Sequence, residues 1–170
     1  MIIRLIILLL AGLILTIMPL PDILIQGRPP WILLIVLYVQ LYLPNYFNVA
    51  VVFTMGIMLD SLLVTVIGEH ALALCVVTWL ANSKARRFAL FPMGQQMGFI
   101  GFFAMAYQLI IVLIDSFLGD QAKLVSVIGG GVVSVLVWPW LRLMGEEFLL
   151  TARHSSPRKY RENTLEYRAK

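Results

Sequence analysis

Long hydrophobic runs separated by short polar breaks make up most of this 170-residue chain. The breaks are rich in proline, glycine and charged residues, which interrupt helices. Residues 31–67 would be about 55 Å long as one helix, against a bilayer core of about 30 Å, so we split them at "LPNYFN". The pattern predicts six helices, at residues 2–18, 31–43, 49–67, 71–84, 95–117 and 124–143. We therefore expect one all-α domain over residues 1–150.

The fourth predicted helix is the least secure of the six. Its apolar part, residues 71–81, is only about 16–18 Å long, which is too short to cross a bilayer alone. Two interpretations stay open. Either the helix extends toward Lys84 and spans, or it is partly re-entrant.

Composition indicates which solvent surrounds these helices. Hydrophobic residues make up 61% of the chain and charged residues only 13%, with a mean hydropathy of +0.91. Soluble domains carry about 25% charged residues, and a small globule leaves much of its surface exposed. We therefore expect an integral membrane protein. The first run begins near Arg4 like a secretory signal, but it lacks an A-x-A cleavage pattern, so we interpret it as a retained helix.

The charge distribution predicts the topology of the six helices. With the N-terminus in the cytoplasm, one side of the membrane receives eleven Lys and Arg residues, and the other receives two, Arg28 and Lys123. The positive-inside rule requires such an excess on the cytoplasmic side. If the fourth helix did not cross, "KARR" at residues 84–87 would face outward and break the rule. We therefore predict six spans with both termini in the cytoplasm.

The tail at residues 151–170 holds all of the surplus positive charge, with six Lys or Arg residues and two Glu residues. Anionic membrane lipid would attract it at about 1 kcal/mol per basic residue near the surface. A cytoplasmic partner is the second interpretation. The third is a solvated tail that only fixes topology.

An acid, Asp60, lies inside the apolar run "MGIMLDSLLV". A carboxylate at the centre of a membrane helix costs roughly 2.5–3.5 kcal/mol, so such an acid is a candidate functional residue. Gly56 shares its helix face by the i, i+4 rule. The other polar groups expected at this side of the membrane are Arg28, Glu69, His70, Asp115 and Lys123.

Two explanations of how Asp60 is tolerated stay open. Either Arg28 or Lys123 reaches inward along its apolar stem, or the carboxyl group is protonated. Its role is then a clamp between helices or the handling of an ion or small substrate. His70 adds a titratable group at the same helix mouth, and we expect no second acid deep enough to form a proton chain with Asp60.

Small residues at i, i+4 spacing mark candidate helix-packing surfaces, because lipid provides little hydrophobic drive for helices to associate. One row consists of Ser126, Gly130 and Ser134, and another of Gly94 and Gly98. Each row predicts either packing within the chain or a contact surface for another membrane protein.

The sequence has no recognisable catalytic constellation. Its single cysteine, Cys75, lies in an apolar run, and its two histidines are His70 and His154. It has no glycine-rich phosphate loop and no HExxH zinc motif. We expect a protein that is not an enzyme, with no cofactor, no metal site and no nucleic-acid partner.

Two segments resemble one known family. The stretch "MPLPDILIQGRPPW" is similar to the Met-Pro-x-Pro-Asp and Arg-Pro-x-Trp blocks of the rod shape-determining membrane protein family MreD. In "GIMLDSLLVTVIGEHALAL", the positions that match that family are Gly56, Asp60, Gly68, Ala71 and Leu72. The last predicted helix, "GVVSVLVWPWLRLM", is similar as well. The likeness covers about residues 5–150, and the basic tail is longer than the family pattern.

This resemblance implies a non-enzymatic protein of the bacterial inner membrane within the elongasome, the assembly that builds the lateral cell wall. The implied partners are MreC, which it binds, the actin-like MreB filament, and the RodA–penicillin-binding-protein synthase. The family is also distantly similar to the substrate-binding subunits of energy-coupling-factor transporters. That likeness implies a second hypothesis, a small-solute-binding membrane subunit.

Overall fold

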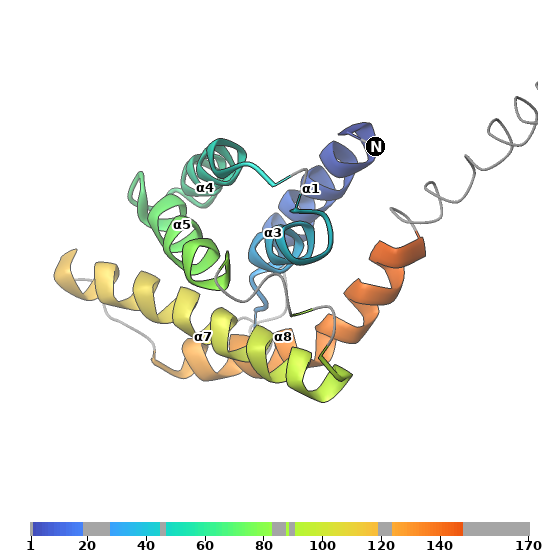
Figure 1. Cartoon of the computed structure of the whole chain (residues 1–170). Coiled ribbons are helices and arrows are strands. Elements are labelled where there is room, and N and C mark those ends of the chain that lie inside the picture. Colours follow the sequence, from blue (N-terminus) through green and yellow to red (C-terminus); the bar gives the residue numbers. More distant parts are fainter. Residues whose placement is uncertain are drawn as a thin grey trace, which may run out of the picture.

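The computed structural model describes residues 2–18, 28–44, 47–82, 88, 91–118 and 124–147. Within these ranges the chain forms six α-helices and no strand (Figure 1). They are α1 (Ile2–Ile17), α3 (Trp31–Tyr42), α4 (Val49–Leu63), α5 (Glu69–Asn82), α7 (Met93–Leu118) and α8 (Leu124–Gly145). The predicted all-α class and the six helices are confirmed. The tail at residues 151–170 and the basic residues Lys84 and Lys123 lie outside the described part of the chain.

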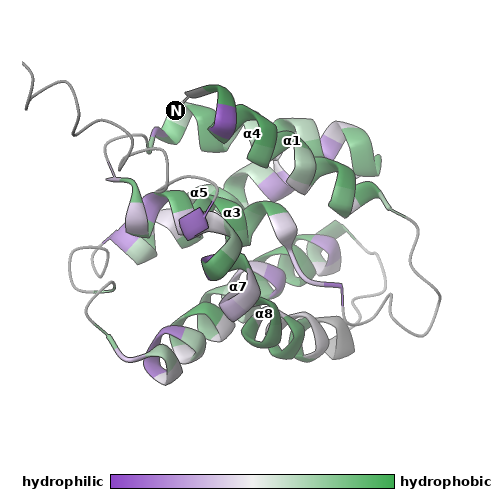
Figure 2. Cartoon of the chain, turned by 90° about the vertical axis from the view of Figure 1, so that its right-hand side faces the viewer, coloured by the Kyte–Doolittle hydropathy of each residue, from purple (hydrophilic) through white to green (hydrophobic). Residues whose placement is uncertain are grey.

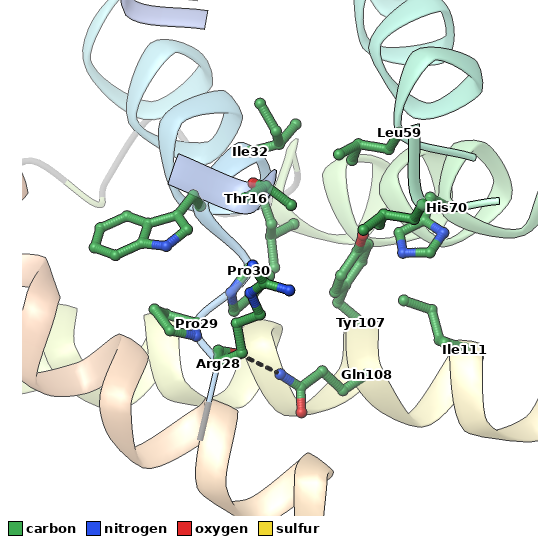
Figure 3. Close-up of a pocket in the computed structure, with 13 residues that line it drawn as sticks. Thr16, Arg28, Pro29, Pro30, Ile32, Leu59, His70, Tyr107, Gln108 and Ile111 are labelled. Carbon is green, nitrogen blue, oxygen red and sulfur yellow. Dashed lines mark hydrogen bonds between the residues drawn. The ribbon is translucent and has the colours of Figure 1, made fainter. Parts of the chain in front are cut away.

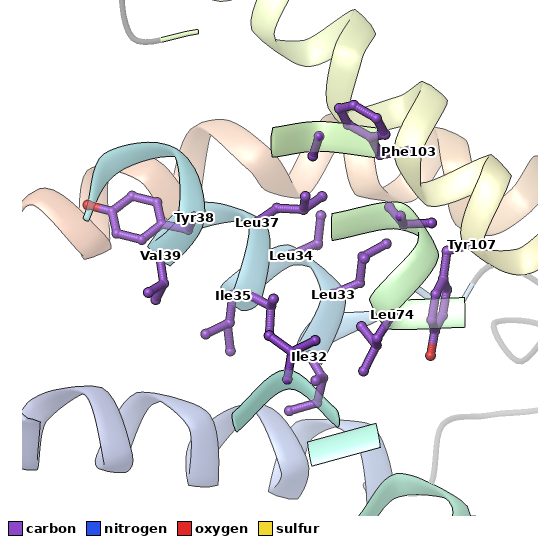
Figure 4. Close-up of a cluster of buried hydrophobic side chains, with 14 of the residues drawn as sticks. Ile32, Leu33, Leu34, Ile35, Leu37, Tyr38, Val39, Leu74, Phe103 and Tyr107 are labelled. Atoms are coloured by element: carbon purple, nitrogen blue, oxygen red, sulfur yellow. The ribbon is translucent and has the colours of Figure 1, made fainter. Parts of the chain in front are cut away.

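The centre of the molecule is α3. Ten consecutive residues of this helix, 32 to 41, are buried, and Figure 4 shows their side chains projecting to several sides. A helix that is apolar around its whole circumference is stable only when other elements surround it. The neighbours include α1, α5, α7 and α8, with Leu74 of α5 and Phe103 and Tyr107 of α7 in the same hydrophobic core.

Two pairs of helices flank this centre. The two longest helices, α7 and α8, pack against each other on one side of α3, and α4 packs on α5 on another (Figure 1). Pro139 lies inside α8, yet the helix continues to Gly145. In a membrane protein, neighbouring helices can compensate for the single backbone hydrogen bond that proline removes.

Most residues along the helices are hydrophobic (Figure 2), and many of the large ones are exposed. Ile14, Trp79, Phe117 and Trp140 are each at least 68% exposed. Exposed apolar patches on this scale are typical of surfaces that meet a membrane or another protein. By length and composition, α7 and α8 are able to cross a membrane. The described surface therefore fits a membrane protein.

The connection between α4 and α5 differs from the prediction. The third helix was expected to run to residue 67, but α4 ends at Leu63 because Val64 adopts a left-handed conformation with φ of 55°. The N–H groups of Val64 and Thr65 both donate to the carbonyl oxygen of Asp60, which turns the chain back. The sequence "GEH" at residues 68–70 was expected to end this helix, but the helix ends five residues earlier, at Leu63. Instead, Glu69 and His70 open α5, two residues before the predicted start.

The starts of α1, α3, α4 and α8 agree with the prediction, and the remaining helix ends, apart from the end of α4, differ from it by one or two residues. The start of α4 has a clear local cause, since Asn48 is its N-cap and accepts a hydrogen bond from the N–H of Ala50 at 2.9 Å. Asparagine is among the best residues for this position.

Candidate functional site

The Asp60 carboxylate accepts hydrogen bonds from the start of α5. Its Oδ2 accepts from the N–H of Gly68 at 2.7 Å, and its Oδ1 accepts from the N–H of His70 at 2.8 Å. The Nδ1 atom of the His70 ring lies 3.0 Å from the same Oδ1. Asp60 is only 1% exposed, so these bonds form away from solvent.

This geometry explains how an acid is tolerated within an apolar helix. The first N–H groups of a helix have no partner within it and carry partial positive charge. Asp60, which belongs to α4, therefore acts as an N-cap for α5 from the neighbouring helix. Its partners among the described residues are the start of α5, the His70 ring and the Thr65 hydroxyl, which lies 3.5 Å from Oδ1. Arg28 donates through Nη2 to the carbonyl oxygen of Met18 at 2.6 Å instead, and Lys123 lies outside the described residues.

Two glycines complete the contact between α4 and α5. Gly56 lies one turn before Asp60, and a Cβ atom at this position would lie 2.6 Å from the backbone nitrogen of Ala71. Only a residue without a side chain permits such a close approach. Gly68 has φ of +102°, a region that suits glycine, and this conformation directs its N–H to Asp60. We refer to Gly56, Asp60, Gly68 and His70 as the Asp60 joint.

Glu69 is a second buried acid near Asp60, at a position where we expected no acid deep enough to form a proton chain. It is 3% exposed, and its side chain interacts with the carboxyl groups of Asp115 on α7 and of Asp60. From the sequence, Glu69 was expected at a helix mouth, and its burial was not predicted. Glu69 is buried because the turn at residues 64–68 packs the start of α5 against the end of α4.

A cavity of about 200 Å³ lies beside the Asp60 joint (Figure 3). Its walls come from the end of α1, the residues that precede α3, the end of α4, the start of α5 and the middle of α7. The polar side chains in these walls are those of Thr16, Arg28, His70, Tyr107 and Gln108. Tyr107 and Gln108 were not predicted as site residues. Gln108 is a polar residue within the apolar sequence of α7, and this interruption could have marked it as a candidate site residue.

The predicted row on α8 lies partly against this region. Ser134 is fully buried, and its hydroxyl donates to the carbonyl oxygen of Gly130 at 2.6 Å. A Cβ atom at position 130 would lie 2.8 Å from Oε1 of Gln108, so Gly130 makes room for that side chain. Ser126 is in the first turn of α8, and its side chain lies outside the described part of the structure.

The second predicted row does not pack within the described part of the chain. A Cβ atom at Gly94 or Gly98 would meet no other atom within 4 Å. The packing glycine of α7 is Gly101 instead, where a Cβ atom would lie 2.6 Å from Cγ2 of Val135 on α8. Spacing alone does not reveal which face of a helix meets its neighbour. For Gly94 and Gly98, the alternative interpretation, a contact surface for another membrane protein, stays a prediction.

A second polar network lies at the opposite end of α3. Gln96 is fully buried, and its Oε1 accepts from the Tyr42 hydroxyl at 3.0 Å and from Nη1 of Arg142 at 3.3 Å. Its Nε2 donates to the carbonyl oxygens of Phe88 and Phe91. This network ties α3, α7 and α8 to the segment before α7. This network was not predicted from the sequence, although a glutamine at the start of an apolar helix is a usable signal.

Fold and site together define a class: an all-helical protein with an apolar exterior, of the kind found in membranes, in which a buried carboxylate joins two helices. A family model described as the rod shape-determining protein MreD matches residues 1–147. The chain therefore belongs to the MreD family. This result confirms the resemblance seen in the sequence and, because MreD is a family of membrane proteins, agrees with the apolar surface.

A curated relative supports the same assignment. The rod shape-determining protein MreD of Haemophilus influenzae is 26% identical over 117 residues, which are 69% of this chain and 72% of the relative. Family and relative together support a role in cell shape. No solved structure matches the chain, so the expected likeness to energy-coupling-factor transporter subunits finds no support there.

Proposed function

We propose that this protein is a non-enzymatic component of the elongasome in the bacterial inner membrane. It spans the membrane six times, has both termini in the cytoplasm, and binds MreC. Through MreC it supports the MreB filament and the RodA–penicillin-binding-protein synthase, and hence rod shape and lateral peptidoglycan synthesis. The family match over residues 1–147 is the observation that carries the proposal.

Depletion tests the cellular role. Cells that lose the protein should change from rods to spheres, because lateral wall synthesis would lose a membrane component. Expression of the wild-type chain should restore rods. Cells that keep a normal rod shape after complete loss would contradict the proposal.

An apolar groove between α1, α3 and α4 supports a helix-binding role and provides a candidate surface for MreC. Its volume is about 300 Å³, and its walls include Leu9, Val36 and Val51. Lipid-facing helices associate through close packing, which a groove of this kind offers to a single membrane helix of a partner.

Site-specific crosslinking tests this surface. A photoreactive residue at Val51, which is 44% exposed beside the groove, should capture MreC in cells. The matched control is Leu136 on α8, which is 63% exposed and lies outside the groove. Equal capture of MreC from both positions would contradict the assignment of the groove.

A second function, the binding of a small solute, is favoured by the cavity beside the Asp60 joint. This cavity combines apolar walls with a few polar groups, as ligand sites do. Vesicles containing the purified protein with candidate energising subunits should then show saturable uptake or binding. Absence of saturable binding for every solute tried would contradict this second function and would not affect the cell-shape function.

A further inference from the structure

The cavity beside the Asp60 joint has an unusual electrostatic character. Among its described lining residues, Arg28 carries the one permanent charge, and no carboxylate faces the cavity. Asp60 does not line the cavity, although it contacts His70, which does. A partly open cavity with a cation and no anion among its lining residues favours a negatively charged occupant.

Within the described part of the chain, the Arg28 side chain has donors without a partner. A guanidinium group has five N–H donors. Its Nη2 donates to the carbonyl oxygen of Met18, while Nε is buried and has no partner among the described groups. A buried donor without a partner is destabilising, and a bond to an anionic oxygen is the strongest way to satisfy it. Figure 3 shows the Arg28 side chain extending into the space between Thr16 and Tyr107.

Neighbouring groups hold Arg28 in this position. The Nε2 atom of Gln108 donates to the carbonyl oxygen of Arg28 at 3.4 Å, as Figure 3 shows. This bond orients the Gln108 amide, because a flipped amide would place two oxygens together. Gly130 leaves the room that Gln108 needs. The backbone of Arg28 is therefore anchored from α7, and its side chain is directed into the cavity.

The size and place of the cavity limit what it holds. At about 200 Å³ it is smaller than the 300–1,000 Å³ of typical ligand sites, so a nucleotide or a peptide would not fit. Residues at the end of α1 and just before α3 line it, and the proposed six-span topology places these helix ends near the membrane boundary, where phospholipid headgroups lie. Guanidinium groups bind phosphate well because two N–H donors match two oxygens.

We propose that this cavity binds the phosphate group of a small headgroup through the Arg28 guanidinium. The proposal rests on the second function above, a binding site beside the Asp60 joint, and names its ligand chemistry. The phosphate belongs either to a membrane lipid such as phosphatidylglycerol or to a free ester such as glycerol 3-phosphate.

Lipid retention by the purified full-length protein tests the proposal. Native mass spectrometry in detergent with added phosphatidylglycerol should show bound lipid for the wild-type chain. Arg28→Gln should reduce retention by about tenfold or more, because one charge-assisted hydrogen bond to an anion is lost. Competition with glycerol 3-phosphate identifies the source: displacement of the lipid indicates a site for free phosphate esters, and its absence indicates a lipid site.

Thr54→Val is the matched control outside the cavity. Thr54 is exposed on α4, and its hydroxyl donates to the carbonyl oxygen of Ala50 at 2.8 Å, so this nearly isosteric change should leave retention unchanged. If Arg28→Gln does not give a monodisperse protein, Gln108→Leu replaces it and should also weaken retention, because it releases the Arg28 backbone. Equal retention by the Arg28 or Gln108 variant and by Thr54→Val would overturn the proposal. Saturable uptake of another solute that does not depend on Arg28 would overturn the phosphate assignment while keeping the binding function.

Discussion

At the scale of single residues, the main feature is a buried acid that accepts hydrogen bonds from two backbone N–H groups of the neighbouring helix start. Asp60 accepts from the N–H groups of Gly68 and His70, one on each carboxylate oxygen, and lies beside the His70 ring. A helix end needs acceptors for its first N–H groups, and in an apolar environment water does not supply them. The acid therefore stabilises the start of α5 at the place where the chain reverses direction.

Substitution of Asp60 by asparagine tests whether its charge or only its hydrogen bonds are needed. Asparagine keeps one acceptor oxygen but places an NH₂ group against one of the two backbone N–H donors. We expect Asp60→Asn to lower the free energy of unfolding by about 1–3 kcal/mol, measured by thermal unfolding in detergent. Rod shape should be largely retained where the protein accumulates normally.

Ser61→Ala is the control for that experiment. Ser61 is exposed on the same helix, and its change should stay within about 0.5 kcal/mol. An Asp60→Asn protein that is as stable as the wild type but fails to maintain rods would show that the charge or a proton serves function directly.

At the scale of helices, close approach at one glycine determines how α4 and α5 pack. Gly56 faces the backbone of Ala71, whereas Gly98 on α7 faces open space in the described structure. Both glycines lie within helices and look alike in sequence. Only the first has a neighbour that a methyl group would displace.

We therefore expect Gly56→Ala to lower the stability of the protein and Gly98→Ala to raise it. At position 56 the added methyl group meets backbone atoms that cannot move freely, and overpacking costs about 1–3 kcal/mol or more. At position 98 alanine should raise stability by about 0.5–1 kcal/mol, because it restricts the unfolded chain and favours the helix. Thermal unfolding midpoints of the two variants in the same detergent measure the contrast. A shift of the same sign and size in both would contradict the packing of α4 on α5.

At the scale of the whole molecule, the proposed six-span topology makes a prediction about accessibility. In a Cys75→Ala background, a cysteine at Lys123 should react with a membrane-impermeant thiol reagent added to intact cells. A cysteine at Lys84 should react only after the cells are opened, because the proposed topology places residues 84–87 in the cytoplasm. Labelling of Lys84→Cys in intact cells would show that residues 84–87 face the outside of the membrane, and it would contradict the six-span topology.

The sequence by itself determined the helical class, the six helices with most of their ends, and the family. Hydrophobic periodicity and proline or glycine breaks are local properties, so they can be read along the chain. The family motifs around Asp60 and Arg28 are local as well. Where a prediction failed locally, as at the end of α4, a single left-handed residue, Val64, had changed the outcome.

Only the tertiary structure decided which groups meet. The sequence offered Arg28 or Lys123 as partners of Asp60, but the helix reversal after Leu63 places the amides of Gly68 and His70 against it. It offered Gly94 and Gly98 for packing, but the crossing of α7 and α8 brings Gly101 to Val135. Such contacts join residues on different helices, and they depend on crossing angles and rotations that leave no periodic trace in either helix.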